Sequence, residues 1–204
     1  MLIWERHKES SSIFITFDDG PTPGVTDKAL DLLKSYGAKG TFFCKGINVQ
    51  KYPELYQRIL DEGHDVGNHT FNHLKGWSTK NRLYFDDIED ANKLIGSTLF
   101  RPPYGKITYP QIRHLRKTYH IIMWDVMSFD YDQSIGPEEC AKNVISNVEP
   151  GSIITFHDSI SAARNMLYAL EALLEFSTDR FVTSSKLSEE IGTFSKIASH
   201  TEPQ

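Results

Sequence analysis

Short runs of β-branched and aromatic residues alternate along this chain with longer stretches that have helical spacing. The runs predict strands at Ile13–Phe17, Gly40–Cys44, Asp65–Asn68, Leu99–Phe100, Tyr119–Trp124, Ser152–Phe156 and Arg180–Val182. The stretches between and after them predict helices at Thr26–Tyr36, Pro53–Glu62, Thr79–Gly96, Tyr109–Lys117, Pro137–Val148, Ser161–Glu175 and Ser184–Ile191. A strand followed by a helix, repeated about seven times, predicts an α/β fold with a mainly parallel sheet, open or closed into a barrel.

Length and charge exclude several classes of protein. The 204 residues suffice for one core and contain no linker, so we expect a single domain over 1–204 with a polar tail at 195–204. The net charge of −5 offers no basic surface for nucleic acid. No apolar run approaches the length of a membrane span, and the N-terminus has no apolar core of a signal peptide, so we expect a cytoplasmic protein. The oligomeric state is left open.

Polar residues follow the predicted strands in a regular way. The carboxyl ends of parallel strands meet at one edge of a sheet or barrel, where active sites lie. The residues that we expect at this edge are Asp18 and Asp19, His69 and His73, Arg101, Asp125 and Asp130, and His157 with Asp158.

Two histidines at positions 69 and 73 have the spacing of one face of a helical turn. Neutral imidazoles at this spacing suit a metal ion, and Asn68 and Thr70 are placed to cap the turn. Two histidines do not complete a coordination sphere, so a carboxylate from another strand is required. The alternative is a pair of ordinary surface or core histidines.

The adjacent carboxylates of Asp18 and Asp19 stand at the end of the first predicted strand. Neighbouring side chains on an extended backbone point in different directions, so the two acids are expected to have different partners. One metal ligand and one base would satisfy this expectation. The alternative is that Asp-Gly-Pro forms only a tight turn.

Two further segments carry polar residues in stiff or strand-end positions. Pro102 and Pro103 restrict the backbone around Arg101 and Tyr104, and Arg101 is expected to pair with a free carboxylate. His157 ends a strand, where a carboxylate from the neighbouring strand would make it a general acid.

Five motifs in order carry a family resemblance: TFDDGP at 16–21, HTFNH at 69–73, RPPY at 101–104, DVMSFDY at 125–131 and HD at 157–158. Together they resemble the polysaccharide deacetylase family, the NodB-homology group or carbohydrate esterase family 4. The resemblance runs from about Ile13 to Val182. It implies a distorted (β/α)7 barrel, which agrees with the repeat of strands and helices.

The resemblance implies a metal-dependent hydrolase that removes N-acetyl groups from glycans containing N-acetylglucosamine, such as peptidoglycan or chitin-like polymers. It assigns a divalent metal to Asp19, His69 and His73. These ligand types favour zinc, and cobalt or nickel also fit them.

The same resemblance implies the catalytic roles. Asp18 is the general base for attack by water and Arg101 is its partner. His157 is the general acid, oriented by Asp130. The backbone N–H of Tyr104 stabilises the oxyanion.

The expected substrate pocket departs from the family pattern. We place Tyr131, Thr155 and Pro103 in its wall. Thr155 stands where the family commonly has leucine, and Tyr131 and Met127 stand where it commonly has tryptophan and aspartate. The metal and acid–base residues match the pattern, so the departures concern substrate identity.

Three alternatives to N-deacetylation stay open: an O-acetyl esterase of the xylan type, an amidase for a small molecule, and a non-catalytic carbohydrate-binding relic of the fold. A relic should have lost part of the metal triad or the base, which this chain retains. Trp77 could stack on a sugar, but we expect it to be packed in the interior.

Overall fold

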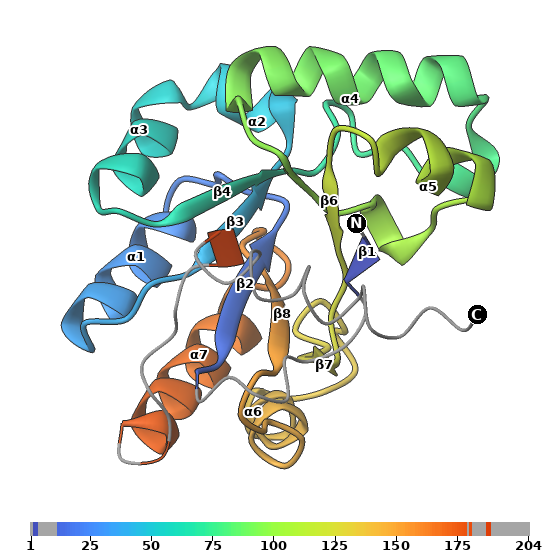
Figure 1. Ribbon diagram of the computed structural model, residues 1–204. Helices are drawn as coiled ribbons and strands as arrows, with labels where there is room; N and C mark the ends of the chain where they lie inside the picture. Colours follow the sequence, from blue (N-terminus) through green and yellow to red (C-terminus); the bar gives the residue numbers. More distant parts are fainter. Residues whose placement is uncertain (1, 4–11, 179, 181–186, 189–204) are drawn as a thin grey trace.

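The structure, a computed structural model, describes residues 2–3, 12–178, 180 and 187–188. Its centre is one curled sheet, in the order β1-β6-β5-β4-β3-β2-β8-β7, in which every neighbouring pair of strands is parallel (Figure 1). The strands are β1 (Leu2–Ile3), β2 (Phe14–Asp18), β3 (Thr41–Cys44), β4 (Asp65–Asn68), β5 (Leu99–Phe100), β6 (His120–Ile122), β7 (Val126–Met127) and β8 (Ile153–His157). Strands β2 to β8 form a half-barrel.

Helices surround the outside of this half-barrel (Figure 1). The α-helices are α1 (Thr26–Ser35), α2 (Gly46–Lys51), α3 (Pro53–Asp61), α4 (Asn81–Ile95), α5 (Tyr109–Leu115), α6 (Pro137–Ile145) and α7 (Ala163–Ser177). Two short 3-10 helices, η1 (Gly76–Ser78) and η2 (Pro103–Gly105), lie in the loops after β4 and β5.

Most predicted elements are confirmed within a few residues of their bounds. The short elements β1, β7 and α2 were not predicted. Arg180, from the last predicted strand, lies at a turn, and the rest of that strand lies outside the described residues. The predicted helix Ser184–Ile191 is also outside them, apart from residues 187–188.

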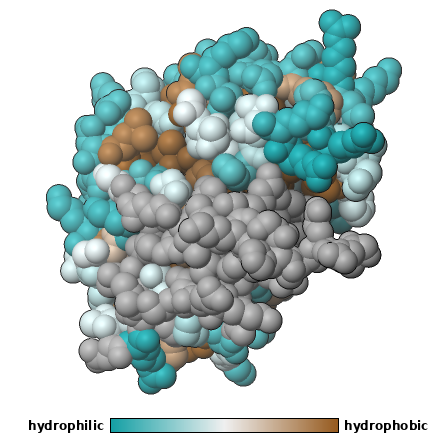
Figure 2. All heavy atoms as spheres, in the orientation of Figure 1, coloured by the Kyte–Doolittle hydropathy of each residue, from teal (hydrophilic) through white to brown (hydrophobic). Residues whose placement is uncertain are grey.

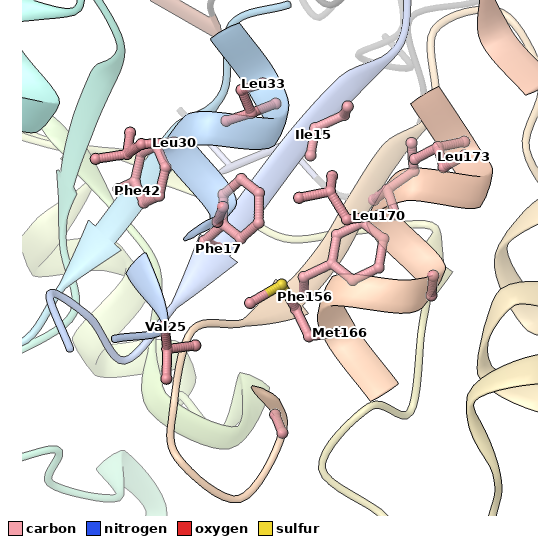
Figure 3. Packing of buried hydrophobic residues seen from close by; sticks show 14 of the residues in the cluster. Ile15, Phe17, Val25, Leu30, Leu33, Phe42, Phe156, Met166, Leu170 and Leu173 are labelled. Carbon is pink, nitrogen blue, oxygen red and sulfur yellow. The ribbon is translucent and has the colours of Figure 1, made fainter. Parts of the chain in front are cut away.

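The alternation of β2 separates the core from the site. Ile15 and Phe17 face outward into the main apolar cluster, where they meet side chains of α1 and α7 (Figure 3). Ile13 and residues of α3 belong to the same cluster. Phe17 stacks on Phe42 at 4.6 Å and on Phe156 at 5.9 Å between ring centroids. Burial of such side chains is the main stabilising contribution to the fold.

The inward face of β2 changes from apolar to polar along the strand. Register pairs Phe14 with Ile153 at the base, and these two residues belong to a separate apolar cluster. One layer higher, Thr16 pairs with Thr155, and at the top Asp18 pairs with His157. Because side chains alternate with a period of two, the same strand supplies both the core and the site.

Asp125 does not lie with the other strand-end residues. The segment expected as one strand, Tyr119–Trp124, is followed by a second strand, β7, so Asp125 precedes a strand instead of following one. Its carboxylate accepts hydrogen bonds from the Ile153 N–H at 2.5 Å and the Ser152 hydroxyl at 2.8 Å. Asp125 therefore anchors the beginning of β8, and its predicted place at the site is wrong.

The described surface is largely polar in the view of Figure 2, with hydrophobic patches between hydrophilic side chains. Within the described residues, no helix has both the length and the apolar character needed to cross a bilayer. Cys44 and Cys140 are buried free thiols.

Candidate functional site

A cavity of about 410 Å³ opens at the carboxyl edge of the strands. All five motifs contribute residues to its lining, the motif at 101–104 only through Tyr104. The lining residues are Asp18, Asp19, His69, His73, Tyr104, Trp124, Met127, Tyr131 and His157. Polar groups from distant parts of the chain therefore share one space with three aromatic rings.

Asp18 is paired with a buried arginine beneath this cavity. Arg101 Nη1 donates to Asp18 Oδ1 at 2.9 Å, and both side chains are almost fully buried. The second carboxylate oxygen, Oδ2, lies 4.0 Å from His69 Nε2. The predicted partnership of Arg101 with a free carboxylate is thus present in the geometry.

Arg101 is held on all sides. Nη1 also donates to the Thr16 hydroxyl at 2.6 Å, Nε to the Ile122 carbonyl at 3.2 Å, and Nη2 to the Met123 carbonyl at 2.9 Å. The guanidinium lies 4.2 Å above the Phe43 ring centroid. Burial lowers the pKa of Arg101 and the charge of Asp18 opposes that change. A guanidinium remains protonated in proteins, so it supplies a fixed positive charge beside Asp18.

Asp19, His69 and His73 form a candidate metal site. Their ligand atoms all lie within 4.8 Å of one another. Asp19 Oδ1 is 3.3 Å from His73 Nε2 and is buried without a hydrogen-bond partner. A buried carboxylate oxygen without a donor is costly, and a cation between these three groups would satisfy it. The residues present therefore fit a divalent metal.

The backbone of Arg101 sets the orientation of His69. His69 Nδ1 lies 2.8 Å from the Arg101 carbonyl oxygen, which can only accept a hydrogen bond. The proton is therefore on Nδ1, and Nε2 is free to bind a metal. Such a bond from the second imidazole nitrogen is usual for metal-binding histidines.

The titration of these groups favours the ligand state. Burial lowers the pKa of His69, and burial together with the charge of His69 lowers the pKa of His73 to about 4. Burial alone would raise the pKa of Asp19, but His69 and Lys45 outweigh it and the pKa is lowered. Two neutral imidazoles and an ionised carboxylate are the forms that bind a metal.

The segment between the two histidines is a loop, so the predicted helical turn is wrong. Thr70 and His73 have left-handed backbones, with φ of 64° and 59°. The predicted capping by Asn68 and Thr70 is confirmed, because Asn68 Oδ1 accepts the Thr70 N–H at 2.8 Å and Thr70 Oγ1 accepts the Leu74 N–H at 3.2 Å. These side-chain acceptors replace the carbonyls of a helix.

Asp87 is a supporting residue that the sequence reasoning missed. From α4, its carboxylate accepts the N–H groups of Phe71 and Asn72 at 2.8 and 3.0 Å and the Asn72 side-chain amide at 2.6 Å. The sequence feature that could have revealed it is a charged residue on the buried face of a helix, between Tyr84 and Ala91. A carboxylate in that position needs several donors.

His157 and Asp130 form a second pair across the cavity. Asp130 Oδ1 lies 2.7 Å from His157 Nδ1, and Oδ2 accepts the His157 backbone N–H at 2.7 Å. Burial lowers the pKa of His157, but the hydrogen bond and charge of Asp130 outweigh it and raise the pKa to about 9. His157 is therefore protonated at neutral pH, with Nε2 on the side away from Asp130.

Left-handed backbones are concentrated at this site. The non-glycine residues with positive φ among the described residues are Asp19, Thr70, His73, Tyr104 and Phe129. Three of them line the cavity, Thr70 lies between the histidines, and Phe129 precedes Asp130. Each such conformation costs about 1 kcal/mol or more and persists where the surrounding structure enforces it.

The cavity wall differs from the predicted pocket in two residues. Tyr131 lines it, as predicted, but Thr155 and Pro103 do not. Thr155 lies one layer below, where its hydroxyl is 3.4 Å from that of Thr16. Met127 is the register partner of Thr155 and lines the cavity together with Trp124, which was not predicted.

Asp158 fixes the turn that follows the two adjacent acids. It is fully buried and accepts the Gly20 N–H at 2.7 Å and the Thr26 hydroxyl at 2.5 Å, while its own N–H donates to the Asp18 carbonyl at 3.1 Å. Burial raises the pKa of Asp158 to about 7, although these hydrogen bonds act to lower it. The turn expected from Asp-Gly-Pro is therefore built around the carboxylate of Asp158.

The unpredicted helix α2 holds the same turn from the other side. Asn48 Nδ2 donates to the Asp19 carbonyl at 2.8 Å, and the Lys45 N–H donates to the Gly20 carbonyl at 3.0 Å. Lys45 Nζ also lies 3.4 Å from Asp19 Oδ1. The position of Asp19 thus depends on contacts from both α2 and β8.

Comparison with known proteins shows which family this chain is similar to. The family described as polysaccharide deacetylase matches residues 5–120. A peptidoglycan-N-acetylglucosamine deacetylase of Bacillus cereus is 36% identical over 194 residues, which are 90% of this chain and 91% of the relative. The peptidoglycan-N-acetylmuramic acid deacetylase PdaC of Bacillus subtilis is 36% identical over 186 residues, which are 87% of this chain but only 38% of PdaC.

The fold is also shared with solved structures. The structure of peptidoglycan deacetylase PdaC from Bacillus subtilis has a TM-score of 0.82 to this chain, with 29% identity over 95% of this chain and 96% of that one. This likeness and the curled sheet confirm the predicted (β/α)7 barrel.

Gly20→Ala tests the turn around Asp158. An added Cβ would lie 2.0 Å from Asp158 Oδ2, so either the turn or the carboxylate, which is held by Thr26, must shift. We expect the free energy of unfolding to fall by about 2 kcal/mol and zinc affinity to fall roughly tenfold or more. Denaturant unfolding and calorimetric zinc titration measure the two effects.

Gly136→Ala is the matched control, because its Cβ would meet only Glu138 Oε2, at 3.4 Å. It should leave both quantities unchanged. Wild-type stability and zinc affinity in Gly20→Ala would show that Asp158 does not position the turn.

Proposed function

The chain belongs to the polysaccharide deacetylase family, and we propose that it removes N-acetyl groups from a peptidoglycan-type glycan with the help of a zinc ion. The observation that carries the proposal is one cavity in which an Asp18–Arg101 pair and a His157–Asp130 pair accompany three metal-binding side chains. The relatives' names supply the substrate class.

Asp19, His69 and His73 would hold the metal. One aspartate and two neutral histidines suit zinc, with cobalt or nickel as alternatives, and leave room for other ligands. When bound, such an ion polarises an acyl oxygen and makes water a better nucleophile.

Asp18 would take the proton of the attacking water. Its Oδ1 is engaged by Arg101, while Oδ2 points toward His69 Nε2 and the cavity. The hydrogen bond from Arg101 holds the carboxylate in one orientation, which a general base requires. The two acids that stand together in the sequence would thus do different work.

His157 would donate a proton to the leaving amine. An amine leaves poorly as an anion, so without this proton the tetrahedral intermediate would revert. Asp130 holds His157 by two hydrogen bonds and favours its protonated form. His157 and Asp18 line the same cavity, on paired strands β8 and β2.

The backbone N–H of Tyr104 would stabilise the oxyanion of that intermediate. Tyr104 has a φ of 61° in the stiff segment after Pro102 and Pro103. A single donor of this kind contributes about 3 kcal/mol to transition-state stabilisation.

The acetyl methyl group would pack against Trp124, Met127 and Tyr131. These residues line the cavity, whereas Thr155 lies below it. Methionine adapts its shape to a small apolar group, so Met127 would cover the position next to Thr155.

An O-acetyl esterase or a small-molecule amidase would use the same residues, since the chemistry at the acyl carbon is shared. A carbohydrate-binding relic is disfavoured because no member of the metal triad, the base or the acid is missing from the cavity.

Acetate release tests the function. We expect release from N-acetylated peptidoglycan, loss after treatment with a chelator, and recovery on addition of zinc. Chitin oligomers, acetylated xylan and small N-acetyl compounds are assayed beside it. Release only from xylan or only from small compounds would replace the proposal with the corresponding alternative. No release from any substrate by the zinc-loaded protein would refute it.

Asp130→Asn tests the role of His157. His157 acts as an acid while it is protonated, so activity is expected to fall as the pH rises through its pKa, about 9 in the free protein. Asparagine removes the charge that raises this pKa, so the alkaline limb of kcat/KM should move to lower pH by about one unit or more. The pH profile measures it, with Asp132→Asn, a partly buried residue that does not line the cavity, as control. An unmoved limb would contradict the assignment.

A further inference from the structure

Trp77 is exposed, which corrects the expectation that it packs in the interior. Its side chain is 61% exposed, among the most exposed large hydrophobic residues described. Exposing an indole of this size to water carries a free-energy cost, and large aromatic rings on a surface are common where a partner binds.

The indole is nevertheless held in one place. Its Nε1–H donates to the Ile107 carbonyl at 2.9 Å, and Lys106 Nζ lies 4.3 Å above the ring centroid. Gly76 brings the two loops into close contact, since a Cβ there would lie 2.5 Å from the Lys106 carbonyl oxygen. Trp77 is therefore a rigid ring on a rigid loop, and binding to it would cost little ordering.

These loops continue directly from the catalytic cavity. Tyr104 lines the cavity, its ring centroid is 4.6 Å from that of His73, and its side chain is 60% exposed. Lys75 Nζ lies 5.8 Å from the Tyr104 ring centroid, and Lys75 is separated from Trp77 only by Gly76. Two exposed aromatic rings, each beside a lysine, thus extend from the metal ligands to the rim.

The rim of the cavity formed by segments 69–81 and 101–112 differs in charge from the whole chain. Segments 69–81 and 101–112 contain no aspartate or glutamate, although the net charge of the protein is −5. A flat ring beside ammonium groups suits a sugar ring that carries a carboxylate on a neighbouring substituent.

We propose that Trp77, braced by Lys106, is a subsite that binds a sugar unit of the glycan strand at least two units away from the one being deacetylated. The inference rests on the proposed function, because the cavity must receive one unit of a glycan for a more distant unit of the same strand to reach the indole. Trp77 takes no part in the reaction itself. Its contribution is to substrate affinity and to the preference for long strands.

Trp77→Ala and Trp77→Phe test the subsite by steady-state acetate release. The substrates are N-acetylglucosamine oligomers of two and six units and soluble peptidoglycan strands. For the long substrates we expect Trp77→Ala to raise KM about tenfold with little change in kcat, and to leave the dimer unaffected. Trp77→Phe keeps a stacking ring and should recover most of the loss.

Tyr168→Ala removes another exposed aromatic ring, on α7, and should change nothing. Unchanged KM values for long substrates in Trp77→Ala would overturn the subsite, and so would an equal change for the dimer. Failure of the wild-type protein to release acetate would instead refute the proposed function. An inactive protein does not consume the oligomers, so calorimetric titration with the hexamer then decides whether Trp77→Ala weakens binding.

Discussion

A fully buried arginine is the group on which the site depends. Moving a guanidinium out of water costs several kcal/mol, and that cost is offset only if the charge is paired and its N–H groups have acceptors. Arg101 meets both conditions through Asp18, Thr16 and two backbone carbonyls at the end of β6. Its backbone carbonyl also accepts from His69. One residue therefore orients both the proposed base and a candidate metal ligand.

The backbone conformation directs the side chains of the adjacent residues Asp18 and Asp19 to different partners. Asp18 belongs to β2 and points into the half-barrel, above Thr16 and Phe14. Asp19 has a φ of 89°, which turns its carboxylate toward His73. Asp158, Asn48 and the backbone of Lys45 hold this conformation in place. Like charges can stand together here because each has its own cationic or hydrogen-bonding partner.

Local patterns predicted the parts of the fold that local physics determines. The short apolar runs and the helical spacing between them were sufficient for a parallel α/β sheet and for the edge at which the polar residues meet, whereas the barrel was implied by the family resemblance. The errors came from long-range contacts. The loop after His69 is not helical because Asp87 and Asn68 supply its acceptors. Asp125 does not lie at the site because β7 begins directly after it. Trp77 is exposed and its N–H donates to the carbonyl of Ile107 on a neighbouring loop.

The coupling between Asp18 and Arg101 is measured most directly by a double-mutant cycle on kcat/KM for acetate release. The variants are Asp18→Asn, Arg101→Lys and the double variant, each checked for folding by denaturant unfolding. If Arg101 acts through Asp18, the double variant should lose little more activity than Asp18→Asn alone, with a coupling free energy of about 2 kcal/mol. Losses that add within about 0.5 kcal/mol would show that the two residues act independently, and would contradict the central place of the buried pair.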